Sequence, residues 1–265
     1  MFLHANAKFN FSGQRWLLVF TLLIFVIAGF ACESSRQESK ANIKKPNQLT
    51  EAEIADGWTL LWDGSTFQGW RAIYKQEFPE TGWIIENDAL VCLGTALLDS
   101  MRGGAIITIN QYTSFELKLE FKIQLGGNSG IKYFIDEELK ASPGHGLGLE
   151  YAILDDENWP YDKPNYNRTC GSLYELVKAD ADKPSHPVGE WNVAKVIVDG
   201  NHIEHWLNGQ KVAEIVKGSD EYRTLVAQSK YHKIEGWGEF PKGHILLQDE
   251  GPRAEFRNIK LREIK

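Results

Sequence analysis

The chain lacks most of the short motifs that identify a metal or nucleotide site. Only 3 of its 265 residues are Cys, and no CxxC pair or Cys/His cluster is present, which argues against a structural zinc site. A P-loop, an EF-hand loop, an HExxH helix and a GxSxG nucleophile turn are also absent. Cys92 and Cys170 could form one disulfide or remain as two buried thiols.

Basic residues are also in short supply. The chain has 29 Lys and Arg against 36 Asp and Glu, which makes its formal net charge -7 and its pI about 5.6. A phosphate backbone is bound by clustered Lys and Arg, and no such cluster lies along the sequence. Nucleic acid is therefore not an expected partner. Aromatic residues are abundant, with 9 Trp and 9 Tyr, and flat aromatic faces serve both protein cores and sugar-binding clefts.

The first 31 residues are predicted to be a lipoprotein signal peptide. Lys8 and Arg15 precede an apolar run that starts at Trp16 and is short for a membrane span. Small residues directly before Cys32, followed at once by polar ones, resemble a bacterial lipobox. We expect Cys32 to be acylated, residues 32–54 to form a flexible tether, and the domain to be anchored by lipid alone in the bacterial cell envelope, periplasmic or outer-membrane. An ordinary cleaved signal and a short anchor helix are the alternatives, and both also place the domain outside the cytoplasm.

Beyond the tether the dominant pattern is alternation. From Phe115 to Ile123 every second residue is apolar and every intervening one is charged, which predicts a half-buried strand. No segment carries a long helical stripe. Similar shorter runs, separated by Gly- and Asn-rich turns, lie at 131–135, 149–154, 193–199, 202–207 and 244–248. Many short strands without alternating helices predict an all-β sandwich or jelly roll, in which 193–209 forms two successive hairpins.

Short blocks rich in Gly, Trp and Asn are spread over residues 55–265. They include Gly57-Trp58-Thr59-Leu60-Leu61-Trp62-Asp63-Gly64, Asn128-Ser129-Gly130-Ile131, Gly171-Ser172-Leu173-Tyr174, Glu204-His205-Trp206-Leu207-Asn208-Gly209 and Gln248-Asp249-Glu250-Gly251. Their content and order resemble the DUF1080 family, also called the 3-keto-disaccharide hydrolase domain, over the whole of residues 55–265. Family members commonly carry His at the position of Glu250, which puts any role of that His in question here.

The resemblance implies a concanavalin A-like jelly-roll sandwich, in which two curved antiparallel sheets leave a concave face that can hold a sugar. It also implies cleavage of 3-keto-glycosides, including 3-keto-disaccharides, that a partner sugar 3-dehydrogenase has oxidised. A ketone at C3 acidifies the C2 proton because the carbanion is delocalised as an enolate. A base can then remove the proton, the C1 substituent is expelled, and water adds to the enone. Such a site needs a base, an acid for the departing oxygen, and a cation or donor beside the enolate.

Glu150 is the first candidate for the base. It is a lone carboxylate in the otherwise apolar strand 149–154, where a charge needs a partner, a cleft or a metal. Lys132 is a similar lone charge, and if the two strands are neighbours the side chains could meet on the concave face. Lys132 would then stabilise an enolate or orient the base, or the two could form a structural ion pair. His205 is a further candidate acid, base or metal ligand, although a lone His on a strand is commonly structural.

Five residues are expected to bind the substrate: Asp155, Trp159, Tyr161, Gln248 and Trp237. Asp155 ends its strand before a long irregular segment that carries Trp159 and Tyr161 and could form a lid over a sugar. Gln248 could bond a sugar hydroxyl, and Trp237 lies in residues 230–238, a second candidate wall of the cleft. No motif in the sequence specifies a cofactor.

A divalent metal ion and two other functions stay open. Glu150, Asp155 and His205 together could hold a metal that polarises the ketone. A non-catalytic carbohydrate-binding module on the same fold would be compatible with Glu250 in place of the family His. An ordinary retaining glycosidase would need two carboxylates about 5–5.5 Å apart, and the ExDxxE strand signature of some jelly-roll glucanases is missing.

Overall fold

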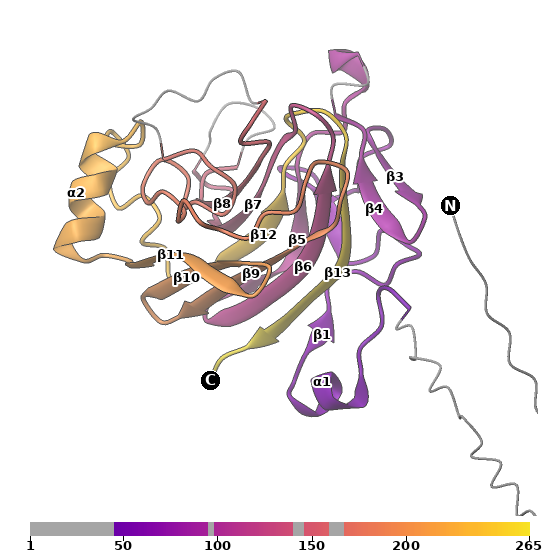
Figure 1. The fold of residues 1–265 in the computed structure, drawn as a ribbon, viewed down its shortest axis with the longest axis horizontal. Coiled ribbons are helices and arrows are strands. Elements are labelled where there is room, and N and C mark those ends of the chain that lie inside the picture. The colour runs from indigo at the N-terminus through magenta and orange to yellow at the C-terminus, as the bar shows by residue number, and fades with distance from the viewer. Residues whose placement is uncertain (1–44, 95–97, 140–145, 159–166) are drawn as a thin grey trace, which may run out of the picture. The chain divides into compact units, whose positions relative to one another are not determined.

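The computed structural model describes residues 45–94, 98–139, 146–158 and 167–265, and their strands form two antiparallel β-sheets (Figure 1). These residues belong to one compact unit, Lys44–Lys265. Buried residues from both sheets make up one main hydrophobic cluster, so the sheets pack face to face. The predicted all-β sandwich of two antiparallel sheets is confirmed. Among the described residues we find no helix with both the length and the apolar character of a membrane span.

The larger sheet has eight strands and the smaller has five. The larger sheet contains β1 (Thr59–Leu60), β3 (Trp83–Glu86), β4 (Ala89–Cys92), β6 (Phe115–Ile123), β9 (Asn192–Asp199), β10 (His202–Leu207), β11 (Gln210–Val216) and β13 (Ala254–Glu263). The smaller sheet contains β2 (Trp70–Ala72), β5 (Ile106–Tyr112), β7 (Asn128–Ile135), β8 (Leu149–Leu154) and β12 (Gly243–Leu247). The short helices are α1 (Glu51–Ala55), the 3-10 turn η2 (Asp99–Met101) and α2 (Asp220–Gln228).

Strands far apart in the sequence become neighbours in both sheets. The larger sheet has the order β11-β10-β9-β6-β13-β4-β3, with β1 paired to β13, and the smaller has the order β2-β5-β12-β7-β8. The smaller sheet therefore sets β12, β7 and β8 side by side. Polar residues on these three strands, or directly after them, can meet on one face.

The alternating sequence of β6 produces one buried and one wet face. Its apolar residues from Phe115 to Ile123 are buried, and Lys118 on the other face is exposed. Successive side chains of a strand point to opposite faces, which explains the pattern. The two predicted hairpins are confirmed as β9–β10 and β10–β11. The second turn uses Asn208 and Gly209, whose φ angles of 46° and 89° are ones that Asn and Gly adopt readily.

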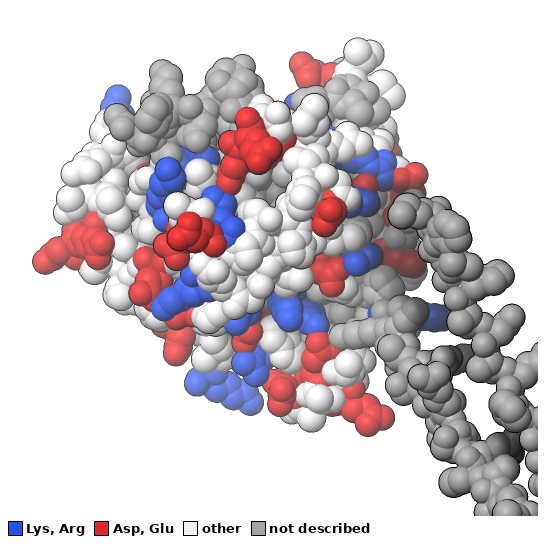
Figure 2. All heavy atoms as spheres, in the orientation of Figure 1, with Lys and Arg blue, Asp and Glu red and all other residues white. Residues whose placement is uncertain are grey.

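Charges of both signs are interspersed over the face of the molecule drawn in Figure 2. The described residues on this face form no continuous basic area.

The interior between the sheets is largely aromatic and aliphatic. Tyr133 of β7 and Tyr151 of β8 meet His205 of β10 there, and all three are buried. Cys92 and Cys170 are buried free thiols and form no disulfide. Burial raises the pKa of Cys170 to about 12, so this thiol stays protonated at neutral pH.

The segment 169–177 lies along the outer edge of β8. Tyr151 and Leu173 form an antiparallel bridge, and the Tyr174 amide donates to the carbonyl of Glu150 at 3.0 Å. In this register Tyr174 lies opposite Glu150. Residues opposite each other on neighbouring strands share a face, so the Tyr174 side chain lies beside that of Glu150.

Candidate active site

Lys132 and Glu150 form a buried ion pair across two neighbouring strands. β7 and β8 are antiparallel with Lys132 opposite Glu150, as predicted if these strands were neighbours. Lys132 Nζ lies 3.6 Å from Glu150 Oε2 and donates to the carbonyl of Gly146 at 3.2 Å. The two side chains are only 10% and 8% exposed. Since Tyr133 and Tyr151, the next residues along each strand, point into the interior, the pair lies on the opposite face of the smaller sheet.

Gln248, directly after β12, joins the pair from the other side. Its Nε2 donates to Glu150 Oε2 at 3.4 Å and to Glu250 Oε1 at 3.1 Å, so one amide bridges two carboxylates. Its Oε1 is buried and has no hydrogen-bond partner among the described residues. An unsatisfied buried acceptor costs about 1–3 kcal/mol, and a ligand hydroxyl that donates to it would remove that cost. This geometry suits the sugar contact expected of Gln248.

Gly130 leaves the space that these two head groups occupy. Its carbonyl accepts the Gln248 amide at 3.1 Å, which fixes the backbone of Gln248 beside β7. A Cβ at this position would collide with Gln248 Oε1 and lie 2.9 Å from Glu150 Oε1. The missing side chain at Gly130 is thus a condition for the observed arrangement of Glu150 and Gln248.

Burial raises the pKa of Glu150 to about 7. Desolvation is the largest cause, because the carboxylate loses water that the protein does not fully replace. Lys132 opposes the rise, Glu250 adds to it, and Lys230 opposes it. A carboxyl group that titrates near neutrality is well matched to accept and return a proton at physiological pH.

A wall of aromatic rings and one lysine lies beside Glu150. It consists of Tyr174, Tyr231 and Lys230. Lys230 Nζ lies 4.5 Å from the ring centroid of Tyr174 and 5.1 Å from that of Tyr231. Tyr231 stacks on Trp237, with ring centroids 3.9 Å apart and planes at 9°. Burial lowers the pKa of Lys230, while the charge of Glu150 raises it, so these two groups are electrostatically coupled.

Several residues of this wall were missed by sequence reasoning. Arg168 pairs with Glu175 and lies 5.2 Å from the ring of Tyr174, which in turn contacts Lys230. These residues come from irregular segments, which have no periodicity from which a face can be inferred. The available signals were the family block that contains Tyr174 and the candidate wall at 230–238, and neither specified a role.

The structure corrects the expectation that His205 acts in the same site as Glu150. His205 is 1% exposed and lies between the two sheets. Its Nδ1 lies 3.1 Å from the carbonyl of Gly171, an acceptor, so Nδ1 carries the proton and Nε2 accepts from the Tyr133 hydroxyl at 2.9 Å. Burial lowers the pKa of His205 to about 4, which keeps it neutral. Both nitrogens are occupied on the far side of the sheet from Glu150.

Asp155 organises a loop and does not face Glu150. Its carboxylate accepts from the backbone amides of Gly126 at 2.8 Å, Asn158 at 3.1 Å and Glu157 at 3.2 Å. Burial alone would raise its pKa, but these hydrogen bonds hold the pKa below its usual value. Asp155 also lines a separate cavity of about 540 Å³.

Trp237 supports the wall from its buried side. It is 1% exposed, which leaves no surface for a sugar, so the structure also corrects the expectation of a direct contact by Trp237. Its ring backs Tyr231 through the stacking contact, and its carbonyl accepts from the Tyr222 hydroxyl at 2.8 Å. The expected contacts of Trp159 and Tyr161 lie outside the described residues, as does Cys32.

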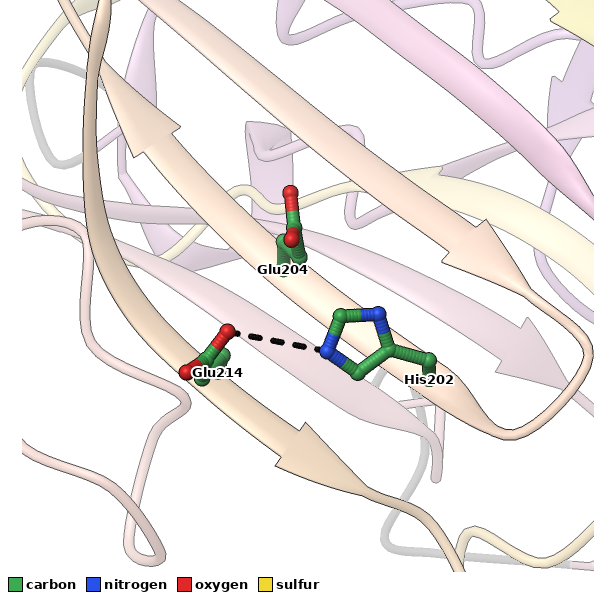
Figure 3. Close-up of side chains that lie close together, drawn as sticks. All are labelled: His202, Glu204 and Glu214. Atoms are coloured by element: carbon green, nitrogen blue, oxygen red, sulfur yellow. Dashed lines mark ion pairs between the residues drawn. The ribbon is translucent and has the colours of Figure 1, made fainter.

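The predicted metal ligands Glu150, Asp155 and His205 are not brought together. Within the described ranges, one group of three side chains could share a cation: His202, Glu204 and Glu214 on β10 and β11 (Figure 3). Glu204 alternates with the buried His205, so this group lies on the outer face of the larger sheet. Lys211 Nζ lies 3.4 Å from Glu204 Oε1 and also pairs with Glu214. A cation of the chain itself therefore already pairs with both carboxylates.

Comparison with known proteins covers nearly the whole of this domain. Residues 57–262 match the family model described as the 3-keto-alpha-glucoside-1,2-lyase-like domain. A protein of Bacteroides thetaiotaomicron named 3-keto-disaccharide hydrolase is 30% identical over 264 residues, which cover 86% of this chain and 90% of that protein. A crystal structure of a candidate glycosyl hydrolase from Parabacteroides distasonis has a TM-score of 0.73 at 30% identity and covers 83% of this chain and 100% of its own. A second one from the same organism has a TM-score of 0.59 at 28% identity, with coverages of 78% and 99%.

Proposed function

The chain belongs to the 3-keto-alpha-glucoside-1,2-lyase-like family, and from this membership we propose that it is an enzyme that cleaves glycosides carrying a ketone at C3. The names of the family and of the Bacteroides relative support the substrate class. The observation that carries the mechanism is Glu150, a buried carboxyl group whose pKa is raised to about 7 at the centre of a polar cluster. The substrate must come from a reaction that oxidises a sugar at C3, and a sugar 3-dehydrogenase is the class that does so.

Glu150 is the proposed general base. Its carboxylate takes the C2 proton, whose acidity comes from the neighbouring C3 carbonyl. The electron pair then expels the C1 oxygen, which takes a proton from solvent and leaves as an alcohol. Water adds its oxygen to C1 of the resulting double bond and returns a proton to solvent. The proton acquired by Glu150 can return to C2 in this last step. General base catalysis of this kind contributes about 10²–10⁴-fold to a rate.

Lys132 and Gln248 are the proposed positioning groups. The Lys132 ammonium, held by Glu150 and the carbonyl of Gly146, fixes the carboxylate and supplies positive charge near the developing negative charge. Gln248 holds Glu150 through Nε2 and offers its unsatisfied Oε1 to a sugar hydroxyl. Such a hydroxyl contact would orient the ring so that C2 faces the base.

An aglycone-release assay tests this function. Purified protein is incubated with a chromogenic 3-keto-glucoside and with its unoxidised parent, each with and without EDTA. We expect release from the keto form alone. EDTA sensitivity would add a metal requirement that this mechanism does not include.

The parent glycoside is the decisive control, because Gln248 brings Glu150 and Glu250 into one recess. Two nearby carboxylates are also what an ordinary glycosidase uses. Release from the parent would favour that chemistry. Binding of the parent without any release would favour a carbohydrate-binding module.

We also propose that Cys32 is acylated and holds the domain in the bacterial envelope. The support is the apolar run before Cys32 and the polar stretch after it. Cells labelled with a palmitate analogue should yield labelled protein in the membrane fraction. A Cys32→Ala variant should lose the label, and retention of label would contradict the assignment.

A further inference from the structure

We propose that Lys230 is a second catalytic residue, a nucleophile whose amine forms an imine with the C3 ketone of the substrate. This inference rests on the proposed function, because an amine can condense only with a substrate that carries a carbonyl group. Two lysines of the described residues interact electrostatically with Glu150, namely Lys132 and Lys230, and their surroundings differ.

Lys132 already has two oxygen partners. It pairs with Glu150 at 3.6 Å and donates to the carbonyl of Gly146 at 3.2 Å. Lys230 keeps part of its surface open to solvent although protein atoms partly desolvate its amine, and no oxygen of the described residues forms a hydrogen bond or ion pair with its Nζ. Its contacts are the faces of Tyr174 and Tyr231. An amine with no oxygen partner and an open approach is the better nucleophile of the two.

The charges around Lys230 favour the neutral amine that attack requires. Burial is the largest cause of its lowered pKa, and the positive charges of Arg168 and Lys132 lower it further. Glu150 and Glu175 act in the opposite direction without reversing the outcome. Desolvation and neighbouring cations are the known means of activating a lysine for Schiff-base chemistry.

The backbone that carries Lys230 is well held. Ser229 Oγ donates to the carbonyl of Val226 at 2.8 Å and accepts from the Tyr231 amide at 3.1 Å. The ring of Tyr231 is fixed by stacking on Trp237. Lys230 thus projects from a turn that is fixed on both sides, as a positioned nucleophile requires.

The reaction balances without an oxidant or a reductant. The neutral Lys230 amine adds to C3, and the carbonyl oxygen leaves as water after two proton transfers, which yields an iminium ion. Glu150 removes the C2 proton, and the electron pair forms an enamine. The enamine then expels the C1 oxygen, which departs as an alcohol, and a conjugated iminium remains. Water adds to C1, C2 regains a proton, and a second water releases the 3-keto sugar and the free amine.

An iminium is a stronger electron sink than a ketone, so the C2 proton becomes more acidic and Glu150 can remove it more readily. The faces of Tyr174 and Tyr231 also suit this intermediate. Aromatic faces attract cations, and the iminium keeps a positive charge at the nitrogen that now lies over both rings.

Reductive trapping tests the proposal. Full-length protein is mixed with a 3-keto-glucoside and sodium cyanoborohydride near pH 7, and intact mass and peptide mapping then locate any sugar adduct. Lys230→Arg should abolish the adduct and lower turnover by about 10²-fold or more, within the usual range for a catalytic group. Lys242→Arg, the same substitution at an exposed lysine outside this turn, is the matched control and should keep both the adduct and the turnover.

The outcomes separate this inference from the proposed function. An adduct on Lys230 together with turnover supports both. Turnover without an adduct, or with an adduct only on Lys132, overturns the imine and leaves the elimination by Glu150 intact. Absence of turnover on any 3-keto-glycoside overturns both.

Discussion

The two faces of the β7–β8 pair treat buried polar groups in opposite ways. On the inner face Tyr133 and Tyr151 surround His205, and each imidazole nitrogen has one partner. One residue earlier along each strand, on the outer face, Lys132 and Glu150 share a recess with Gln248 and its unsatisfied oxygen. The same two strands thus carry a closed network on one side and an open one on the other.

Burial moves both titratable groups away from their ionised forms. It lowers the pKa of His205 to about 4 and raises that of Glu150 to about 7. His205 is therefore neutral and fully bonded at pH 7, whereas Glu150 is near its midpoint with part of its surroundings unsatisfied. A satisfied polar group stabilises the fold, and an unsatisfied one is available for a ligand.

The largest effect is expected from replacing the outer carboxylate. Glu150→Gln should lower kcat about 10³-fold, because the amide cannot take the C2 proton. The far-UV circular dichroism spectrum should be unchanged, since Gln fills the same space. Glu157→Gln, at an exposed carboxylate, should keep normal kinetics, and wild-type turnover by the Glu150 variant would remove this residue from the mechanism.

A smaller loss is expected when the outer recess is crowded. Gly130→Ala should lower kcat/KM by about 10–100-fold, because the added methyl displaces Gln248 and Glu150 from their positions. A double-mutant cycle with Gln248→Ala isolates the cause. If the methyl acts through Gln248, the two effects will be clearly less than additive, and strict additivity would contradict that route.

The pH dependence of stability should reveal the cost of the outer carboxylate. Between about pH 4.5 and pH 7, folded Glu150 keeps a proton that the unfolded chain has released, so rising pH favours unfolding at this site. Gln does not titrate. Glu150→Gln should therefore gain about 2 kcal/mol in free energy of unfolding relative to wild type between pH 5 and pH 8. Urea titrations at several pH values measure this difference, and a constant difference would refute the raised pKa.

The inner face should respond to pH with the opposite sign. Below about pH 6.5 the unfolded chain protonates His205 while the folded chain resists until about pH 4, so wild type loses stability as pH falls. His205→Gln should cost about 1 kcal/mol at pH 7 through lost hydrogen bonding. This deficit should shrink and then reverse toward pH 4.5, because wild type alone loses about 2 kcal/mol over this range. Tyr133→Phe should show a similar deficit at pH 7 without the same shrinkage. Equal slopes for the two variants would count against a neutral buried His205.

The positions of the strands could be predicted from the sequence. The face of the sheet on which each polar side chain lies could be predicted only in part. Alternation located β6, and lone charges in apolar strands identified Lys132 and Glu150 as partners. His205 was assigned to the wrong side because a polar residue on a strand can be buried at no cost when the fold supplies partners from distant segments. Tyr174 could not be assigned, because its place beside β8 depends on an irregular segment that folds back along the strand edge.

The short α2 helix and the role of Trp237 could not be predicted from the sequence either. The polar sequence from Asp220 to Gln228 buries only Tyr222, so it presents no wide apolar stripe that would announce a helix. In a sequence, an aromatic residue whose ring contacts a ligand cannot be distinguished from one whose ring packs in the core. Only tertiary packing places Trp237 behind Tyr231, whose ring stacks on Trp237 and contacts Lys230.

The segment along β8 has a consequence for solubility. β8 is the last strand of its sheet, and a strand edge with free backbone groups is a template for pairing with other chains. Here the amide of Ala152 donates to the carbonyl of Ser172 at 3.1 Å, and its carbonyl accepts from the amide of Gly171 at 2.9 Å. The contact that brings Tyr174 beside Glu150 therefore also guards this edge against intermolecular sheet growth. Mutations that detach the segment should cause aggregation as well as loss of turnover.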